Sequence, residues 1–317
     1  MTKPLPKVGV SACLLGQQVC FDGGHKRDAF VAGALSEFVA FVPICPETAI
    51  GLGVPRPSIR LVGEFERPRL LGTADPGLDL TQRMERYAHQ QTASLNDLCG
   101  YILKKDSPSC GMQRVKVFNE TSGPAQRKGS GVFARILMQR LTLLPVEEEG
   151  RLNDPVLREN FINRIYVLHR WQALRHQGLN PARLIEYHSV HKYLVMAHSQ
   201  AAYQRLGRLL SDLSHGDLES IAQQYIGELM PTLQRRVTRQ RHVNVLQHVM
   251  GYLKKRIDSD DKAELGNSIE AYRRGEVPLV VPMTLLRHYF RRHPDPYMEK
   301  QVYLNPHPDK LGLRNAI

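Results

Sequence analysis

The stretch Lys104-Lys105-Asp106-Ser107-Pro108-Ser109-Cys110-Gly111 follows a hydrophobic run that ends at Tyr101-Ile102-Leu103. A run of that kind is typical of a buried strand, and the Asp, Ser, Pro and Gly after it predict a tight turn. Cys110 is therefore expected on a turn at the carboxyl end of a strand. In open α/β sheets, this end of the strands borders the functional crevice.

Two other cysteines occur in the same setting. Cys13 follows the apolar run 8–12, and Cys45 follows the run 41–44. Because the carboxyl ends of parallel strands meet at one edge of a sheet, the three cysteines can converge there, and we predict that they hold one metal centre. A second interpretation stays open, since isolated cysteines are commonly small buried hydrophobic residues. A structural zinc site is not expected, because the sequence has no Cys-x-x-Cys pair.

Iron-sulfur clusters are held by cysteine thiolates, normally four. Three ligands would leave one iron of a four-iron cluster open, and a thiophilic Lewis acid of this kind can bind a substrate sulfur. Cys20 and Cys99 are interpreted as non-ligands, since Cys20 lies on a predicted loop and Cys99 begins a strand pattern. A fourth ligand at Cys20 would close the open iron.

Strands and helices alternate around the turn and predict an α/β amino-terminal domain, residues 1–150, with a mostly parallel sheet and flanking helices. The remainder, residues 151–317, lacks a strand pattern and is predicted to be an all-helical domain. The run Glu147-Glu148-Glu149-Gly150 is interpreted as a polar junction between them. The expected strands are 8–15, 41–45, 100–103, 115–118 and 143–146, with a hairpin at 59–62 and 69–71 and a flexible basic loop at 123–131. The expected helices are 27–39, 79–94, 132–141, 155–177, 181–210, 218–230, 233–256, 261–274 and 283–292.

The net charge of +12 points to a polyanionic partner. The first 150 residues carry 18 Lys and Arg against 15 Asp and Glu, whereas the remainder carries 25 against 16. A nucleic acid would therefore bind the second domain, unless the charge only makes the surface soluble. No apolar run approaches the roughly 18 residues of a membrane span, and no signal peptide begins the chain, so a cytoplasmic protein without a membrane partner is expected. No protein partner is predicted.

Basic groups with interleaved aromatic residues in the second domain suit RNA, because cations contact phosphates and rings stack on bases. The predicted contacts are Arg235, Arg236, Arg239, Lys254 and Lys255, with Arg235, Arg239 and His242 near one helix face. The alternative is a solvated surface, with Trp171 and Tyr193 in the core. For His188, His191 and His198, packing or RNA contact is favoured over a metal site.

Several motifs together resemble the thiouracil desulfidase family over residues 6–145. They are Val10-Ser11-Ala12-Cys13-Leu14-Leu15-Gly16, Phe21-Asp22-Gly23, Cys45-Pro46-Glu47, Gly51-Leu52-Gly53-Val54-Pro55-Arg56 and Lys105-Asp106-Ser107-Pro108-Ser109-Cys110-Gly111. The second half resembles a helical domain that is fused to this one in bacterial tRNA 4-thiouridine desulfidases.

The resemblance implies a [4Fe-4S] cluster with one open iron, held by Cys13, Cys45 and Cys110. It also implies Glu47 and Ser107 as catalytic residues, with Glu47 as the general base for water. Asp22, Lys105 and Ser109 are the predicted substrate contacts. Each polar residue also has a local interpretation, since Glu47 can cap a helix, Ser107 can shape its turn, and Asp22-Gly23 is a common turn signal.

The function that the resemblance implies is the non-redox removal of sulfur from 4-thiouridine in tRNA, which gives uridine and hydrosulfide. Two alternatives stay open. The protein could act on free thiouracil or thionucleosides, or it could be a non-catalytic RNA-binding iron-sulfur sensor.

Overall fold

The structure is a computed structural model that describes residues 4–120, 124–214 and 216–317. The chain divides into two compact units between Asn153 and Asp154. Each unit buries an apolar core of its own. In the part of the chain that is described, no helix combines the length and the apolar character needed to cross a membrane.

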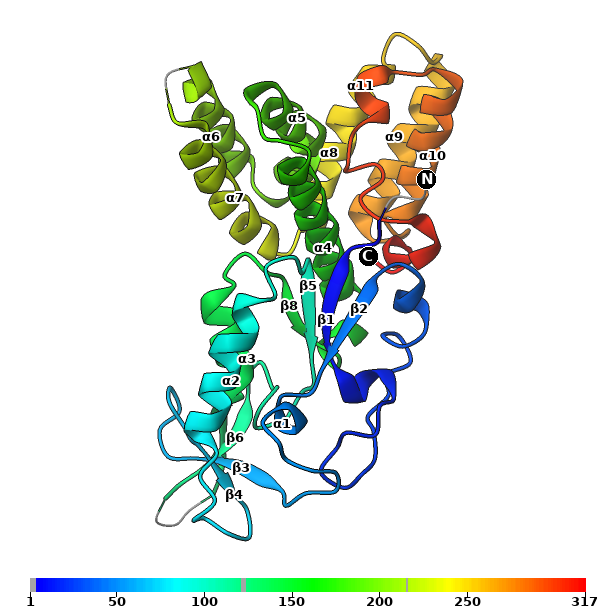
Figure 1. The fold of residues 1–317 in the computed structure, drawn as a ribbon. Helices are drawn as coiled ribbons and strands as arrows, with labels where there is room; N and C mark the ends of the chain where they lie inside the picture. The colour runs from blue at the N-terminus through cyan, green and yellow to red at the C-terminus, as the bar shows by residue number, and fades with distance from the viewer. Residues whose placement is uncertain (1–3, 121–123, 215) are drawn as a thin grey trace. The chain divides into compact units, whose positions relative to one another are not determined.

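Sheet A of the first unit has four parallel strands in the order β2-β1-β5-β8, as Figure 1 shows. The strands are β1 (Lys7–Ser11), β2 (Ala40–Ile44), β5 (Gly100–Leu103) and β8 (Val146–Glu148). Val8 of β1 pairs with Phe41 on one side and with Gly100 on the other, so β1 is central. The predicted parallel sheet is confirmed, and the carboxyl ends of β1, β2 and β5 share one edge.

Sheet B has the order β4-β3-β6-β7. Its strands are β3 (Ile59–Val62), β4 (Arg69–Gly72), β6 (Val115–Phe118) and β7 (Gln126–Gly129). The predicted β3–β4 hairpin is confirmed. The prediction of a loop at 123–131 is wrong for residues 126–129, which form β7, while residue 123 lies outside the described residues. The Gln-Arg-Lys-Gly sequence has low strand propensity, and antiparallel pairing with β6 overrides it.

Two helices, α2 (Thr81–Ala93) and α3 (Val132–Arg140), pack on the core of the first unit. Their buried faces meet Tyr101 and Leu103 of β5. The short elements are α1 (Pro46–Ala49), η1 (Ala12–Leu15), η2 (Ala34–Glu37) and η3 (Arg151–Asn153). The helix predicted at 27–39 is wrong except for the single turn η2, because Gly33 has non-helical backbone angles (φ −113°, ψ −103°).

The second unit is built of helices, as predicted. They are α4 (Pro155–His176), α5 (Pro181–His198), α6 (Gln200–Ser211), α7 (Leu218–Gln234), α8 (Arg239–Met250), α9 (Ser259–Arg274), α10 (Val280–Arg292) and α11 (Pro296–Glu299), with 3-10 turns η4 (Asp212–Ser214), η5 (Gly251–Leu253), η6 (Asp309–Leu311) and η7 (Leu313–Asn315). The helices predicted at 181–210 and 233–256 are each divided. The hydroxyls of Ser199 and Thr238 accept hydrogen bonds from backbone N–H groups of the next helix, so each starts a new helix.

Four histidines among the described residues of this unit are buried: His191, His198, His242 and His307. The Nδ1 atom of His191 lies 2.7 Å from the Tyr187 carbonyl oxygen, and that of His198 lies 2.7 Å from the Arg235 carbonyl oxygen. These contacts favour packing over metal or RNA contact for both. Trp171 and Tyr193 are also buried, which confirms their assignment to the core.

The buried histidines predict that the second unit is sensitive to acid. Burial lowers the pKa of His191 and His242 to about 3, and that of His198 and His307 to about 4, from 6.5. The folded unit therefore holds neutral histidine. Its stability is complete above pH 6.5, falls as the pH drops from 6.5 toward the folded pKa values, and this contribution is fully lost once the pH has passed through them. Each histidine costs about 3 to 5 kcal/mol below its folded pKa. Melting temperatures measured from pH 7 to pH 4 should fall steadily; a flat profile would contradict the buried neutral state.

Candidate active site

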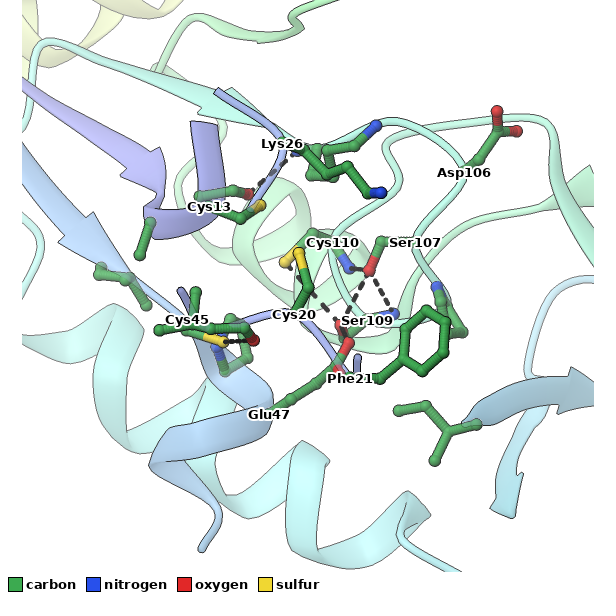
Figure 2. Close-up of a pocket in the computed structure, with 18 of the residues that line it drawn as sticks. Cys13, Cys20, Phe21, Lys26, Cys45, Glu47, Asp106, Ser107, Ser109 and Cys110 are labelled. Atoms are coloured by element: carbon green, nitrogen blue, oxygen red, sulfur yellow. Dashed lines mark hydrogen bonds between the residues drawn. The ribbon is translucent and has the colours of Figure 1, made fainter. Parts of the chain in front are cut away.

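A cavity of about 350 Å³ lies at the carboxyl edge of sheet A. Cys13, Cys45 and Cys110 line it, together with Glu47 and the turn 104–110 (Figure 2). Cys13 lies on η1 directly after β1, Cys45 precedes α1 directly after β2, and Cys110 ends the turn after β5. The structure thus brings together three residues that are up to 97 positions apart in the sequence.

Within the described residues, no disulfide joins the three cysteines to one another or to Cys20 or Cys99. Burial raises the pKa of the Cys13 thiol to about 12, and it raises the pKa of the Cys110 thiol as well. A positively charged centre would stabilise their thiolates, as bound iron does. Within the described residues, no three His, Cys, Asp or Glu side chains could hold one metal ion. A cluster differs from a single ion, because each of its cysteines binds a different iron, so the donor set fits an iron-sulfur cluster.

The turn 104–110 is held by the first residues of α3. The N–H groups of Val132 and Ala134 donate to the carbonyl oxygens of Pro108 and Ser109, at 3.1 Å each. A side chain at Gly131 would collide with the Ser109 carbonyl group, so this close approach requires glycine. N–H groups that have no partner within the helix thereby fix the turn that carries Cys110.

Two buried glutamates hold the ends of the same turn. Glu149 accepts hydrogen bonds from the Lys104 ammonium group at 2.6 Å and from the Lys105 N–H group at 2.8 Å. Glu148 accepts from the Met112 N–H group at 2.8 Å. The interpretation of 147–150 as a polar junction is therefore wrong, because these carboxylates are buried and satisfied by backbone and ammonium donors at the site.

Glu47 is the centre of a partly buried polar chain. Its Oε2 atom accepts hydrogen bonds from Nε and Nη2 of Arg56 at 2.9 and 2.7 Å. Its Oε1 atom accepts from the Ser109 hydroxyl at 2.5 Å, and the Ser109 and Ser107 hydroxyl oxygens lie 3.0 Å apart. Ser107, Ser109 and Glu47 thus form one continuous path for a proton. Arg56 ends the motif Gly51-Leu52-Gly53-Val54-Pro55-Arg56, but this role was not predicted from the sequence.

The remaining predicted substrate contacts differ in their placement. Lys105 lines the cavity. Asp22 is exposed, is not among the lining residues, and accepts a hydrogen bond from the Gly24 N–H group at 3.0 Å, so its contact is that of a turn residue. Phe21 lines the cavity with 49% of its surface exposed (Figure 2). An exposed aromatic ring at this cavity was not singled out from the sequence.

Comparisons with known proteins agree with this geometry. Residues 8–149 match the family model described as 2-thiouracil desulfurase, and residues 192–308 match a model described as a protein of unknown function (DUF1722). The chain belongs to the 2-thiouracil desulfurase family. The matched residues 8–149 include every cavity residue named above.

The chain is also similar to a curated protein and to a solved structure. The uncharacterized protein YbgA of Escherichia coli (strain K12) is 35% identical over 154 residues, which cover 48% of this chain and 91% of YbgA. A solved structure described as the [4Fe-4S]-dependent thiouracil desulfidase TudS is 30% identical and covers 47% of this chain and 94% of that chain, with a TM-score of 0.38.

The predicted RNA contacts of the second unit are all exposed: Arg235, Arg236, Arg239, Lys254 and Lys255. Among the residues that the structure describes, none of the five forms an ion pair with a carboxylate. The prediction of one helix face is wrong, because Arg235 follows the end of α7, Arg239 begins α8, and His242 is buried. Arg239 lies over the Tyr272 ring at 5.2 Å.

Cys20 lies closer to the site than its loop position suggested. It lines the cavity, and its thiol interacts with the Cys13 thiol through a hydrogen bond. If three cysteines hold the cluster in this desulfurase, Cys20→Ser should retain the full iron content of the purified protein, because serine replaces a neighbour and not a ligand. Iron analysis after anaerobic reconstitution would measure this. Loss of iron would make Cys20 a fourth ligand.

Proposed function

We propose that this member of the desulfurase family removes sulfur from 4-thiouridine in tRNA and releases uridine and hydrosulfide. The observation that supports the proposal is the cavity in which the thiols of Cys13, Cys45 and Cys110 meet the Ser107–Ser109–Glu47 chain. Thiols suit a metal centre that binds sulfur, and the hydroxyl chain suits the handling of protons.

Cys13, Cys45 and Cys110 would hold a [4Fe-4S] cluster. When bound, such a cluster supplies an iron without a protein ligand, a Lewis acid with affinity for sulfur. Cys99 is buried in the core and is not among the lining residues. The ligand set therefore excludes it.

Replacing a thiocarbonyl sulfur by a water oxygen exchanges the C=S bond for a C=O bond. One proton of the water leaves with the sulfur as hydrosulfide, and the other must be taken up by a base of the protein. A water beside Ser107 can give a proton to the Ser107 oxygen while the Ser107 hydroxyl passes its own proton to Ser109. Ser109 passes its proton to the Oε1 atom of Glu47 in turn. Arg56 binds the other carboxylate oxygen and keeps Oε1 directed at Ser109. Glu47 is thus the proton acceptor, and the two serines connect it to the cavity.

A stacked base must leave its helix before its sulfur can enter the cavity. Phe21, half-exposed at the cavity, offers a ring on which the pyrimidine can stack. Stacking does not distinguish one pyrimidine from another, so Phe21 would assist thiouracil and thiouridine alike. Recognition of tRNA must then come from contacts outside the cavity.

The exposed cations of the second unit supply such contacts. Neutralising three of them, in the variant Arg235→Gln/Arg236→Gln/Arg239→Gln, should weaken tRNA binding and reduce the slope of log K against log salt by up to about 3. Fluorescence anisotropy of labelled tRNA at several salt concentrations measures both. If the slope stays unchanged, the tRNA site lies elsewhere.

Desulfidation of free thiouracil is the second candidate, because the matched family is described by that base and the cavity suits a single ring. The deciding experiment uses anaerobically reconstituted protein with bulk bacterial tRNA, with free 2-thiouracil in parallel, and nucleosides are quantified by mass spectrometry. Loss of 4-thiouridine matched by a gain of uridine supports the proposal. Turnover of thiouracil alone supports the second candidate, and tRNA binding without sulfide release from either supports a sensor.

A further inference from the structure

We propose that Arg60, Lys116 and Arg127 form a phosphate-binding row on sheet B, next to the active-site cavity. The ligand is a phosphate attached to the substrate thiouridine, either its own 5′-phosphate or the neighbouring phosphate of an RNA backbone. This inference rests on the proposed function and adds a contact in the first unit, which carries little of the net charge.

The strand register brings the three side chains into one row. β3 and β6 pair in parallel with Leu61 opposite Val117, which places Arg60 opposite Lys116. β6 and β7 are antiparallel with Lys116 opposite Arg127. Adjacent strands lie about 4.8 Å apart, so three cationic side chains occupy about 10 Å of one sheet face.

All three side chains line one groove, of about 360 Å³. The groove and the active-site cavity share Ile59, Asp106 and Pro108 in their walls, so the two are neighbours. Asp106 directly precedes Ser107, and Figure 2 shows its carboxylate turned away from Ser107. A nucleotide whose base occupies the cavity can therefore direct its phosphate toward the groove.

Like charges directly opposite each other on neighbouring strands destabilise a sheet, and an anion removes that cost. Arg127 has one partner, Asp106, at 2.6 Å. Arg60 lies over the Phe118 ring at 5.1 Å, and its buried Nε atom has no hydrogen-bond acceptor. Across the described ranges of the chain, no carboxylate pairs with Arg60 or Lys116. The groove is lined by two guanidinium groups, one ammonium group and the carboxylate of Asp106. This excess of positive charge favours a ligand with two or more acceptor oxygens, as phosphate has.

Lys116 is the residue to test, because it is exposed on β6 and its replacement leaves the Arg127–Asp106 ion pair intact. The variants are Lys116→Glu, Lys116→Arg to keep the charge, and Arg86→Glu as a matched charge reversal on exposed α2, outside both cavities. Each is loaded with cluster and checked by thermal melting. Kinetics are measured with 2-thiouracil, 4-thiouridine 5′-monophosphate and tRNA, and tRNA binding is measured against salt.

Lys116→Glu should lower kcat/KM for tRNA about tenfold relative to kcat/KM for thiouracil, which has no phosphate. It should also reduce the salt slope of tRNA binding by about 1 more than Arg86→Glu does, and Lys116→Arg should behave like the wild type. A similar fall in kcat/KM for the monophosphate assigns the row to the 5′-phosphate of the substrate. A fall in kcat/KM for tRNA alone assigns the row to a phosphate of the RNA backbone. An effect of Lys116→Glu no larger than that of Arg86→Glu overturns the inference. If no substrate releases sulfide, the proposed function fails, while the salt slope still decides whether the row binds phosphate.

Discussion

Replacement of Cys13, Cys45 or Cys110 by alanine is expected to remove the bound iron and to lower desulfidation by at least about a thousand-fold. Each of the three thiols follows a different strand of sheet A and lines the same cavity. A cluster that loses one of three ligands loses its anchor on that side, and the cavity offers no other cysteine in an equivalent position. Iron and sulfide content, together with the visible absorbance of the cluster, measure the loss directly.

Cys99→Ala is the matched control for these variants. Cys99 is buried beside β5, away from the cavity lining, so its replacement should cost stability without changing the iron content. A normal iron content in the alanine variant of Cys13, Cys45 or Cys110 would remove that residue from the ligand set. Loss of iron in the Cys99 variant as well would indicate a folding defect common to all of them.

Glu47→Gln is expected to keep the cluster and to lower kcat by about 10²- to 10⁴-fold. Glutamine preserves the volume and can still accept a hydrogen bond from Arg56, but its amide cannot take up a proton. The carboxylate is the last group of the path that begins at Ser107, so turnover loses its proton acceptor. Single-turnover sulfide release at fixed iron content separates this effect from loss of the cluster.

Ser109→Ala tests the path itself. It removes the hydroxyl that bridges Ser107 and Glu47 while leaving both in place, so a loss comparable with that of Glu47→Gln is expected. Glu37→Gln, at an exposed carboxylate on η2, is the control. Wild-type turnover in Glu47→Gln would mean that another group accepts the proton, and sulfide release that is absent even from the wild type would favour the sensor.

The sequence alone determined the fold class and placed Cys13, Cys45 and Cys110 at one edge of the sheet, where they line the cavity. These features follow from local patterns: an apolar run followed by turn residues ends a strand wherever it occurs, and parallel strands place such ends at one edge. The motifs that carry the family resemblance are local in the same way. Errors occurred where local pattern and tertiary pairing disagreed, as in β7 and in the acidic run 147–149.

Only the tertiary structure decided what these residues contact. The Ser109 hydroxyl donates to Glu47 across 62 positions of the sequence, and the Lys104 ammonium group donates to Glu149 across 45 positions. The cationic row depends on the register of β3, β6 and β7, in which a shift of one residue would turn every side chain to the opposite face. Spacing along the chain does not specify that register, because it is fixed by which apolar faces pack together when the two sheets and the helices enclose one core.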